Sequence, residues 1–171
     1  MRIRELNEKS ALIYRVLRLK GLKEEPASFD STYEDEEQLT INDFEEYLKQ
    51  PNQIVFGAFE EADLVGILTL SIKRETKRAH IAKMTSLYVY DEYKEQGISN
   101  SLIASAIMRA RELKCEQIHL SVNIENKHAK SLYISFGFEI IGMEKEILKI
   151  SENKYIDEYR MALYFDEWKE A

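Results

Sequence analysis

The stretch NKHAKSLYISFGF contains two side chains suited to holding a ligand and moving a proton. Asn126 and Tyr133 are seven residues apart, about two turns of an α-helix, so both lie on one helix face. Ala129 lies between them and is small enough to let a ligand pass close. Leu132 and Phe136 predict a core stripe on the adjacent face. Tyr133 is then a phenol on the non-core side, free to donate a proton, although the spacing also fits a tyrosine whose ring caps the core.

A second candidate site lies in SLYVYDEYKEQGISNSL, where an apolar strand gives way to a helix. We expect the strand to end near Tyr90 and the helix to begin near Gly97. The first backbone N–H groups of a helix have no intrahelical acceptor and carry about half a positive charge, so they attract phosphate. Gly97 has no Cβ, which lets an anion approach the main chain. A glycine at such a junction is also typical of an ordinary turn.

These residues must be positioned by an alternation of strands and helices in one domain, residues 1–171. Apolar runs predict strands at residues 2–6, 53–60, 63–73, 79–90, 116–124, 138–150 and 155–165. Apolar residues at helical spacing predict helices at residues 10–22, 40–50, 97–114 and 126–136. The fold class is therefore α/β, with a mixed, mostly antiparallel sheet of about seven strands flanked by about four helices.

Two of these helices have a clear apolar pattern. The first carries five aliphatic residues at helical spacing, namely Leu12, Ile13, Val16, Leu17 and Leu19. The third carries Leu102, Ala106, Ala110 and Leu113 along one face.

The composition narrows the class of protein. The net charge is −7, and an acidic surface repels phosphate backbones, so no nucleic-acid partner is expected. No apolar run approaches the roughly 20 residues of a spanning helix, and no secretory signal is present, so we expect no membrane association and a cytoplasmic protein. The single cysteine, Cys115, is expected to be packed in the interior, and no metal site is expected.

The two stretches together resemble the GNAT N-acetyltransferase superfamily over nearly the whole chain. That family's loop signature is Arg/Gln-x-x-Gly-x-Gly/Ala, and here residues 94–99 read KEQGIS. The second signature is complete at Asn126, Ala129, Leu132, Tyr133, Gly137 and Phe138. The loop departs from the family pattern at three positions. Lys94 replaces Arg or Gln, Glu95 stands where many members have Gly, and Ser99 replaces the closing Gly or Ala.

The resemblance implies acetyl-CoA as the cofactor and names the residues that bind it. The pyrophosphate would lie on the loop, at Lys94, Glu95, Gln96, Gly97, Ile98, Ser99 and Asn100. The pantetheine arm would pair with the preceding strand at Leu87, Tyr88 and Val89, and would pass Asn126 and Ala129. Tyr133 would protonate the departing thiolate as general acid, a step typically worth about 10²–10⁴-fold.

The proton acceptor for the incoming amine is not evident in the sequence. The strand faces next to the expected site offer His119, Ser121 and Asn123 on one strand, and Lys83, Thr85 and Ser86 on another, with no carboxylate. A chain of water molecules could take the proton, so no general base is assigned.

The resemblance also predicts where the acceptor binds and what it is. The pocket would be built by the first two helices, their acidic loop and the last hairpin, with Phe29 and Tyr33 as candidate substrate-binding residues. The implied activity is direct transfer of an acetyl group to a primary amine of a small molecule. Two alternatives stay open: a protein N-terminus or lysine as acceptor, and a module that binds acyl-CoA without catalysis. Family members are often dimers, so a homodimer is expected.

Overall fold

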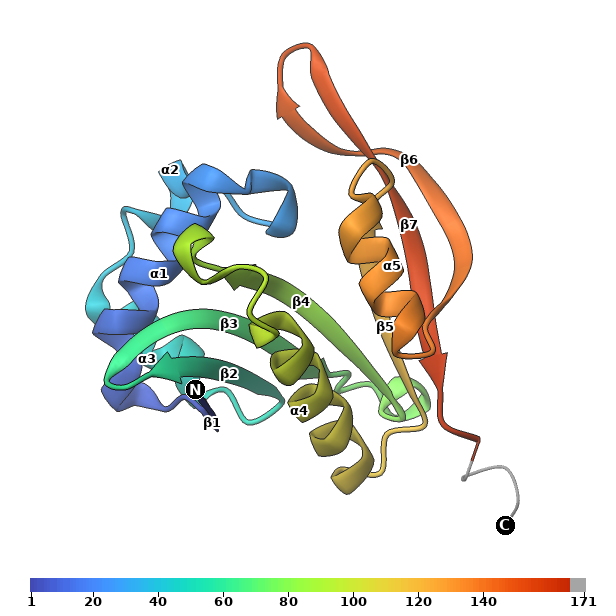
Figure 1. The fold of residues 1–171 in the computed structure, drawn as a ribbon, viewed down its shortest axis with the longest axis horizontal. Helices are drawn as coiled ribbons and strands as arrows, with labels where there is room; N and C mark the ends of the chain where they lie inside the picture. Colours follow the sequence, from blue (N-terminus) through green and yellow to red (C-terminus); the bar gives the residue numbers. More distant parts are fainter. Residues whose placement is uncertain (167–171) are drawn as a thin grey trace.

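A computed structural model describes residues 1–166, and within them seven strands form one sheet in the order β1-β2-β3-β4-β5-β7-β6 (Figure 1). Neighbouring strands are antiparallel except for the parallel pair β4 and β5. The strands are β1 Arg2–Glu5, β2 Gln53–Glu60, β3 Asp63–Ile72, β4 Ile81–Val89, β5 Gln117–Asn123, β6 Glu139–Ser151 and β7 Lys154–Tyr164. The α-helices are α1 Ala11–Glu24, α2 Tyr33–Glu36, α3 Ile41–Lys49, α4 Ile98–Glu112 and α5 Lys127–Ser135. The predicted α/β class and element order are confirmed, and among the α-helices of the described residues only the four-residue helix α2 was not predicted.

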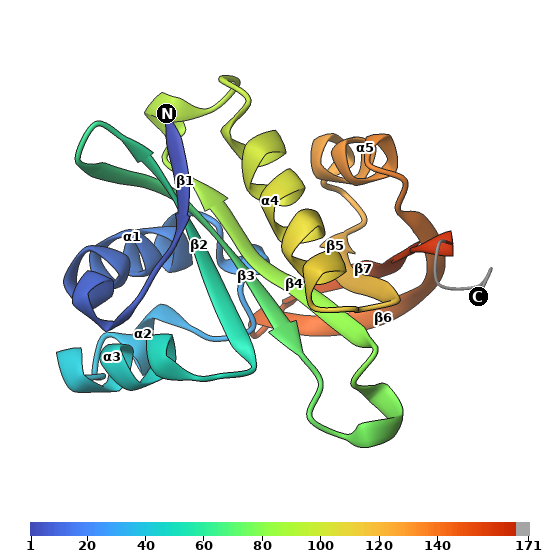
Figure 2. The same ribbon diagram turned by 90° about the horizontal axis from the view of Figure 1, so that it is seen from below.

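Helices cover both faces of the sheet, with α1 and α3 on one side and α4 and α5 on the other (Figure 2). Each layer has its own apolar core. Leu102, Ile118 and Phe138 belong to the core beneath α4 and α5, together with Cys115, which is buried as predicted. Tyr14 and Phe44 belong to the core beneath α1 and α3. No helix of the described residues is both long and apolar enough to cross a bilayer.

The buried face of α1 is only partly the one that its aliphatic residues mark, since of these five Leu17 alone is fully buried. Leu12 and Val16 are 61% and 56% exposed, whereas Tyr14 and Arg18 are buried. Tyr14 stacks on Tyr47 of α3 with ring centroids 6.0 Å apart. The aliphatic pattern misplaced Leu12 and Val16 because aromatic stacking and a buried ion pair, rather than aliphatic residues alone, decide which side faces the sheet. Leu113, which follows α4, is likewise 41% exposed.

The buried ion pair joins α1 to the loop that follows it. Arg18 binds Glu36 of α2 in a bidentate geometry, with N–O distances of 2.6 and 3.0 Å. The same guanidinium donates to the Tyr14 hydroxyl at 3.1 Å. This pair holds the acidic loop that follows α1 against the sheet. Removing one partner would be costly, because the other charge would be left buried without compensation.

We therefore expect Arg18→Met to lower the free energy of unfolding by about 3–5 kcal/mol. The double variant Arg18→Met/Glu36→Leu should recover most of that loss, because no uncompensated charge remains. Urea unfolding measures both effects. Arg15→Met is the matched control, since Arg15 makes an exposed hydrogen bond to the Glu37 carbonyl at 3.2 Å and lies 5.9 Å from the Phe44 ring centroid, whereas Arg18 forms a buried ion pair. A loss below about 1 kcal/mol for Arg18→Met would contradict the expectation.

The parallel strands β4 and β5 pair over only three residues and then separate. Ile81, Ala82 and Lys83 pair with β5, and no residue of β4 beyond Lys83 does so within the described chain. Ser86 has a positive φ of 58°, and the pairing of β4 with β3 shifts register near it. This irregularity bends the strand and opens a gap between β4 and β5 on the side of their carboxyl ends.

Candidate active site

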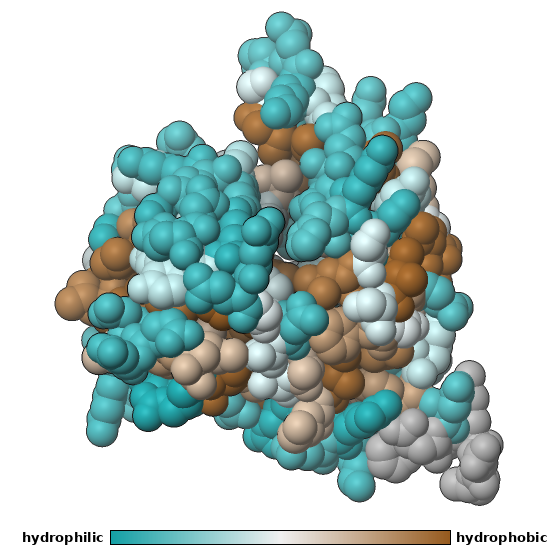
Figure 3. Space-filling view, viewed as in Figure 1, coloured by the Kyte–Doolittle hydropathy of each residue, from teal (hydrophilic) through white to brown (hydrophobic). Residues whose placement is uncertain are grey.

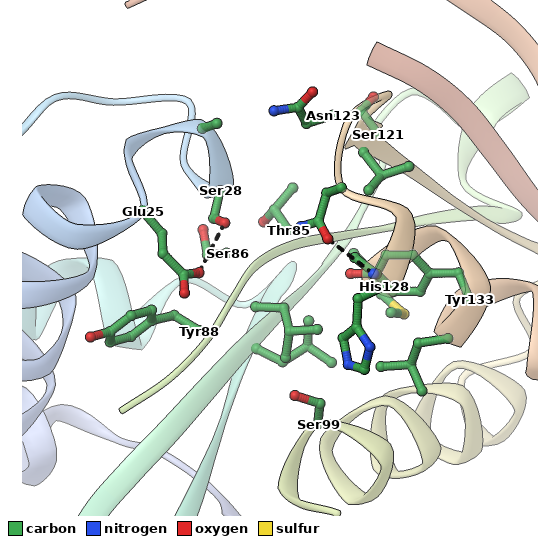
Figure 4. Close-up of a pocket in the computed structure, with 18 of the residues that line it drawn as sticks. Glu25, Ser28, Thr85, Ser86, Tyr88, Ser99, Ser121, Asn123, His128 and Tyr133 are labelled. Carbon is green, nitrogen blue, oxygen red and sulfur yellow. Dashed lines mark hydrogen bonds between the residues drawn. The ribbon is translucent and has the colours of Figure 1, made fainter. Parts of the chain in front are cut away.

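A cavity of about 1030 Å³ occupies the gap between β4 and β5. Its wall combines the loop after α1, strand β4, the start of α4, the first turns of α5 and the β6–β7 hairpin. The surface is hollowed between the α1–α2 side and the hairpin, with a mostly hydrophilic rim (Figure 3). Figure 4 shows Tyr133 and His128 of α5, Thr85 of β4 and Ser99 of α4 around the same space. Segments far apart in the sequence thus meet at one site.

The start of α4 presents backbone N–H groups to this cavity. Gly97 has a φ of +79° and precedes the helix, and the wall continues through Ile98, Ser99 and Asn100. Their amides have no intrahelical acceptor, and the first turn contains no acidic residue. A Cβ built on Gly97 would meet nothing within 4 Å, so the main chain is open to an approaching group. This arrangement fits an anion such as a pyrophosphate.

Lys94 ties the loop before α4 to the opposite wall of the cavity. Its Nζ lies 2.6 Å from Asp91 and also contacts Glu25 of the loop after α1. The hydrogen bonds that Lys94 donates to Asp91 and Glu25 raise the pKa of Lys94. Glu25 in turn accepts a hydrogen bond from Ser28 (3.4 Å; Figure 4). Lys94 is therefore a cation at the cavity mouth whose charge is already balanced by two acidic neighbours.

Glu95 occupies a backbone conformation that favours glycine. Its φ is +63°, and non-glycine residues in this region are strained. A glycine, which the resemblance gives as common at this position, would adopt this conformation without strain.

We expect Glu95→Gly to stabilise the protein by about 0.5–1 kcal/mol and to raise acetyl-CoA affinity by about 3–10-fold. The stability gain comes from relief of the positive φ, and the affinity gain from removal of a carboxylate beside the phosphate site. Glu95→Gln separates the two causes, because it removes the charge but keeps the strain. Thermal unfolding and calorimetric titration provide the measurements. Unchanged affinity in both variants would show that Glu95 points away from the ligand.

Hydrogen bonds at both ends of helix α5 fix the positions of its motif residues Asn126 and Tyr133. The Asn126 side chain caps the helix by accepting a hydrogen bond from the Ala129 amide, with an N–O distance of 3.1 Å. At the other end Gly137 has a φ of +98°. The amides of Phe138 and Gly137 donate to the carbonyls of Tyr133 and Ile134 at 3.1 and 2.9 Å, which is a Schellman cap. Gly137 ends the helix as predicted.

Tyr133 is part of the core and of the cavity wall at the same time. Only 8% of it is exposed, and its ring packs edge-on against Phe138 with centroids 5.8 Å apart. The expectation that it lies on the non-core side is therefore wrong for the ring, because Phe138 folds back beneath the helix. Within residues 1–166 the hydroxyl has no hydrogen-bond partner, and Tyr133 lines the cavity. Burial raises the pKa of Tyr133 to about 12, so the phenol keeps its proton at neutral pH.

The exposed edge of β4 offers a further donor to the cavity. The amide of Tyr90 donates to the Val65 carbonyl of β3 at 3.0 Å. Because consecutive N–H groups of a strand point in opposite directions, the Val89 amide points away from β3 and into the gap. Val89 can therefore donate a hydrogen bond to a group held between β4 and β5.

The structure brings most residues singled out in the sequence to this cavity. They are Leu87, Tyr88, Val89, Lys94, Glu95, Gly97, Ile98, Ser99, Asn100, Asn126, Ala129 and Tyr133. Gln96 does not line it and instead donates to the Glu92 carbonyl at 3.3 Å. Phe29 and Tyr33 do not line it either. Phe29 is buried against Tyr88, and Tyr33 lies beneath the Lys23 ammonium.

Sequence reasoning missed a buried carboxylate on the cavity wall. Glu158 of β7 pairs with Asn123 of β5 and Glu144 of β6, so all three lie in one row. Each lines the cavity. The sequence contained no signal for Glu158, because its position depends on pairing between strands far apart in the chain. His119, considered earlier, lines a separate pocket of about 130 Å³ and contacts Gln117 at 2.6 Å.

The chain belongs to the acetyltransferase (GNAT) family, whose sequence model matches residues 19–138. It is 31% identical over 103 residues to the L-amino acid N-acetyltransferase AaaT of Escherichia coli K12, covering 60% of this chain and 62% of that protein. It is 34% identical over 88 residues to the N-alpha-acetyltransferase MAK3 of Arabidopsis thaliana, covering 50% of this chain and 45% of that protein. The alignments thus span about half to three-fifths of these relatives. A GNAT acetyltransferase structure from Streptococcus pneumoniae superposes with a TM-score of 0.82 at 26% identity, covering 96% of this chain and 99% of that one.

Proposed function

We propose that this protein is an acetyl-CoA-dependent N-acetyltransferase that acetylates a primary amine of a small molecule. One observation carries the proposal: the amides at the start of α4, the unpaired edge of β4 and the Tyr133 hydroxyl all face one cavity. These groups suit, in that order, the pyrophosphate, the pantetheine arm and the sulfur of a coenzyme A thioester. The second family motif is complete at these positions, and the loop motif keeps Gly97 but departs from the family pattern at Lys94, Glu95 and Ser99.

Acetyl-CoA, when bound, supplies the activated acetyl group. In the proposed mechanism the amides of residues 97–100 bind the pyrophosphate, while Asn126 and Ala129 border the arm. The Val89 amide donates a hydrogen bond to the thioester carbonyl oxygen as it gains negative charge. Tyr133 donates its phenolic proton to the sulfur as the amine displaces it. The raised pKa of Tyr133 keeps that proton available.

The acceptor side of the cavity supports a small substrate. The 3₁₀ turn Pro26–Ser28 after α1 comes into contact with β6, which narrows the opening opposite the cofactor side. AaaT is named for the acetylation of L-amino acids, which fits a small-molecule acceptor. MAK3 is named an N-alpha-acetyltransferase, so a protein N-terminus is the second candidate.

Further features of the assembly are also proposals. Residues 1–171 are proposed to form a single N-acetyltransferase domain in the cytoplasm. A homodimer is supported by the edge strand β6, where Ile140, Ile141 and Met143 are 46%, 42% and 55% exposed.

The test is an acetyl-transfer assay that follows release of the coenzyme A thiol. The purified chain is first titrated with acetyl-CoA by calorimetry and then assayed with amino acids, alkylamines, polyamines and short peptides. Binding with turnover on small amines supports the proposal, and turnover on peptides alone favours the second candidate. Binding without turnover across the panel would indicate an acyl-CoA-binding module, and absence of binding would overturn all three.

A further inference from the structure

We propose that Glu158 is the general base that takes the proton from the acceptor's ammonium group. The inference rests on the proposed acetyl transfer and assigns the proton acceptor that the family motifs in this chain do not provide.

The position of Glu158 follows from strand register. Cross-strand partners project from the same face of a sheet, so Asn123, Glu158 and Glu144 point the same way from β5, β7 and β6. Glu158 is therefore one strand away from β5, whose separation from β4 creates the cavity. The acidic loop after α1 brings Asp30 to the same wall, and Lys83 lines it from β4. This row faces the end of the cavity that the acceptor would enter.

Glu158 is a buried residue on the cavity wall, and its carboxylate has no protein partner among the described residues. Only 8% of the residue is exposed, and it has no hydrogen-bond or ion-pair partner within residues 1–166. A buried carboxylate normally has such a partner, because isolated charge is costly in the interior. A cationic ligand that enters the cavity would supply the missing partner.

The surrounding cations are already engaged with other carboxylates. Lys83 lies 3.9 Å from Asp30, and Arg160 lies 3.5 Å from Glu144. The β5 neighbour Asn123 is uncharged. Burial, and then the charges of Asp30 and Glu144, raise the pKa of Glu158, while Lys83 opposes them. These surroundings make Glu158 a stronger base than an exposed glutamate.

The proton accounting for the transfer is complete with these groups. Glu158 takes one proton from the ammonium nitrogen, which frees the lone pair for attack on the thioester carbonyl carbon. The N–C bond forms, the C–S bond breaks, and the sulfur takes the Tyr133 proton. The nitrogen loses its second proton through water to the tyrosinate, which restores Tyr133. Glu158 then releases its proton to solvent, so the net products are amide, thiol and one proton.

The test compares Glu158→Gln with Glu139→Gln, which removes the same charge from β6 outside the cavity. At pH 7 we expect Glu158→Gln to lower kcat/KM for the amine by about 10²-fold, with acetyl-CoA affinity unchanged. The loss should shrink toward pH 9.5, where more of the amine is already neutral. Glu139→Gln should match the wild type at every pH.

Thermal unfolding of the free protein gives a second readout that does not depend on activity. The pKa of Glu158 is raised on folding, so its ionised form destabilises the fold above that pKa and has no such effect once protonated. Glu158→Gln should therefore raise Tm by on the order of 2 °C at pH 8 and leave it unchanged near pH 4. Glu139→Gln should not show this difference.

Each alternative result overturns the inference in an identifiable way. Wild-type rate and pH profile in Glu158→Gln would exclude Glu158 as the base while leaving the acetyltransferase proposal intact. An equal loss of rate at all pH values, with a lower Tm, would assign Glu158 a structural role. A wild-type protein that transfers acetyl to none of the amines would remove the proposed function and this inference together.

Discussion

Replacing Tyr133 with phenylalanine is expected to lower kcat by about 10²–10⁴-fold while acetyl-CoA affinity changes less than about threefold. The substitution removes the phenolic proton but keeps the ring that packs on Phe138. The hydroxyl has no hydrogen-bond partner in the described residues, so stability should change little. A single-turnover assay of thiol release, combined with calorimetry, separates the chemical step from binding.

The control for this prediction is Tyr159→Phe on β7, which removes a hydroxyl from a partly buried tyrosine outside the cavity. It should retain full activity. Because the pKa of Tyr133 is raised to about 12, the wild-type rate should show no decline from tyrosine ionisation between pH 7 and about 10. A Tyr133→Phe variant with wild-type kcat would mean that another group, or water, protonates the sulfur.

Gly97→Glu is expected to weaken acetyl-CoA binding by at least about 100-fold. The side chain would start where the main chain is open to the cavity, and its carboxylate would lie beside the phosphates. The positive φ of Gly97 adds an effect that is unrelated to binding, since any other residue there costs about 1–2 kcal/mol of stability. Calorimetric titration measures the affinity, and urea unfolding measures the strain.

Gly97→Ala and Gly97→Gln are the matched controls for this series. All three variants should lose a similar amount of stability, because each forces a side chain into the same backbone conformation. Affinity should fall in the order Ala, Gln, Glu, as first a methyl group, then bulk and then charge are added. Equal acetyl-CoA affinity in the Gly97→Gln and Gly97→Glu variants would show that the phosphates do not lie at this helix start.

The local features of the site could be predicted from the sequence. Asn126, Tyr133 and Gly137 are linked by helix periodicity and cap chemistry, which act over a few residues and leave a readable pattern. The same holds for Gly97, where a strand meets a helix. The alternation of apolar runs likewise gave the element order. These predictions depend on contacts within a short segment, so the sequence by itself determined them.

The acceptor side of the cavity was decided only by the tertiary structure. Glu158 faces the site because β7 pairs with β5 in one register, and a shift of one residue would turn its side chain to the other face. Arg18 rather than Val16 faces the sheet because Glu36, eighteen residues further along the chain, neutralises it. Phe29 lies in the core for a similar reason, since the ring of Tyr88 receives it. Such placements depend on partners distant in the chain, and no local periodicity encodes them.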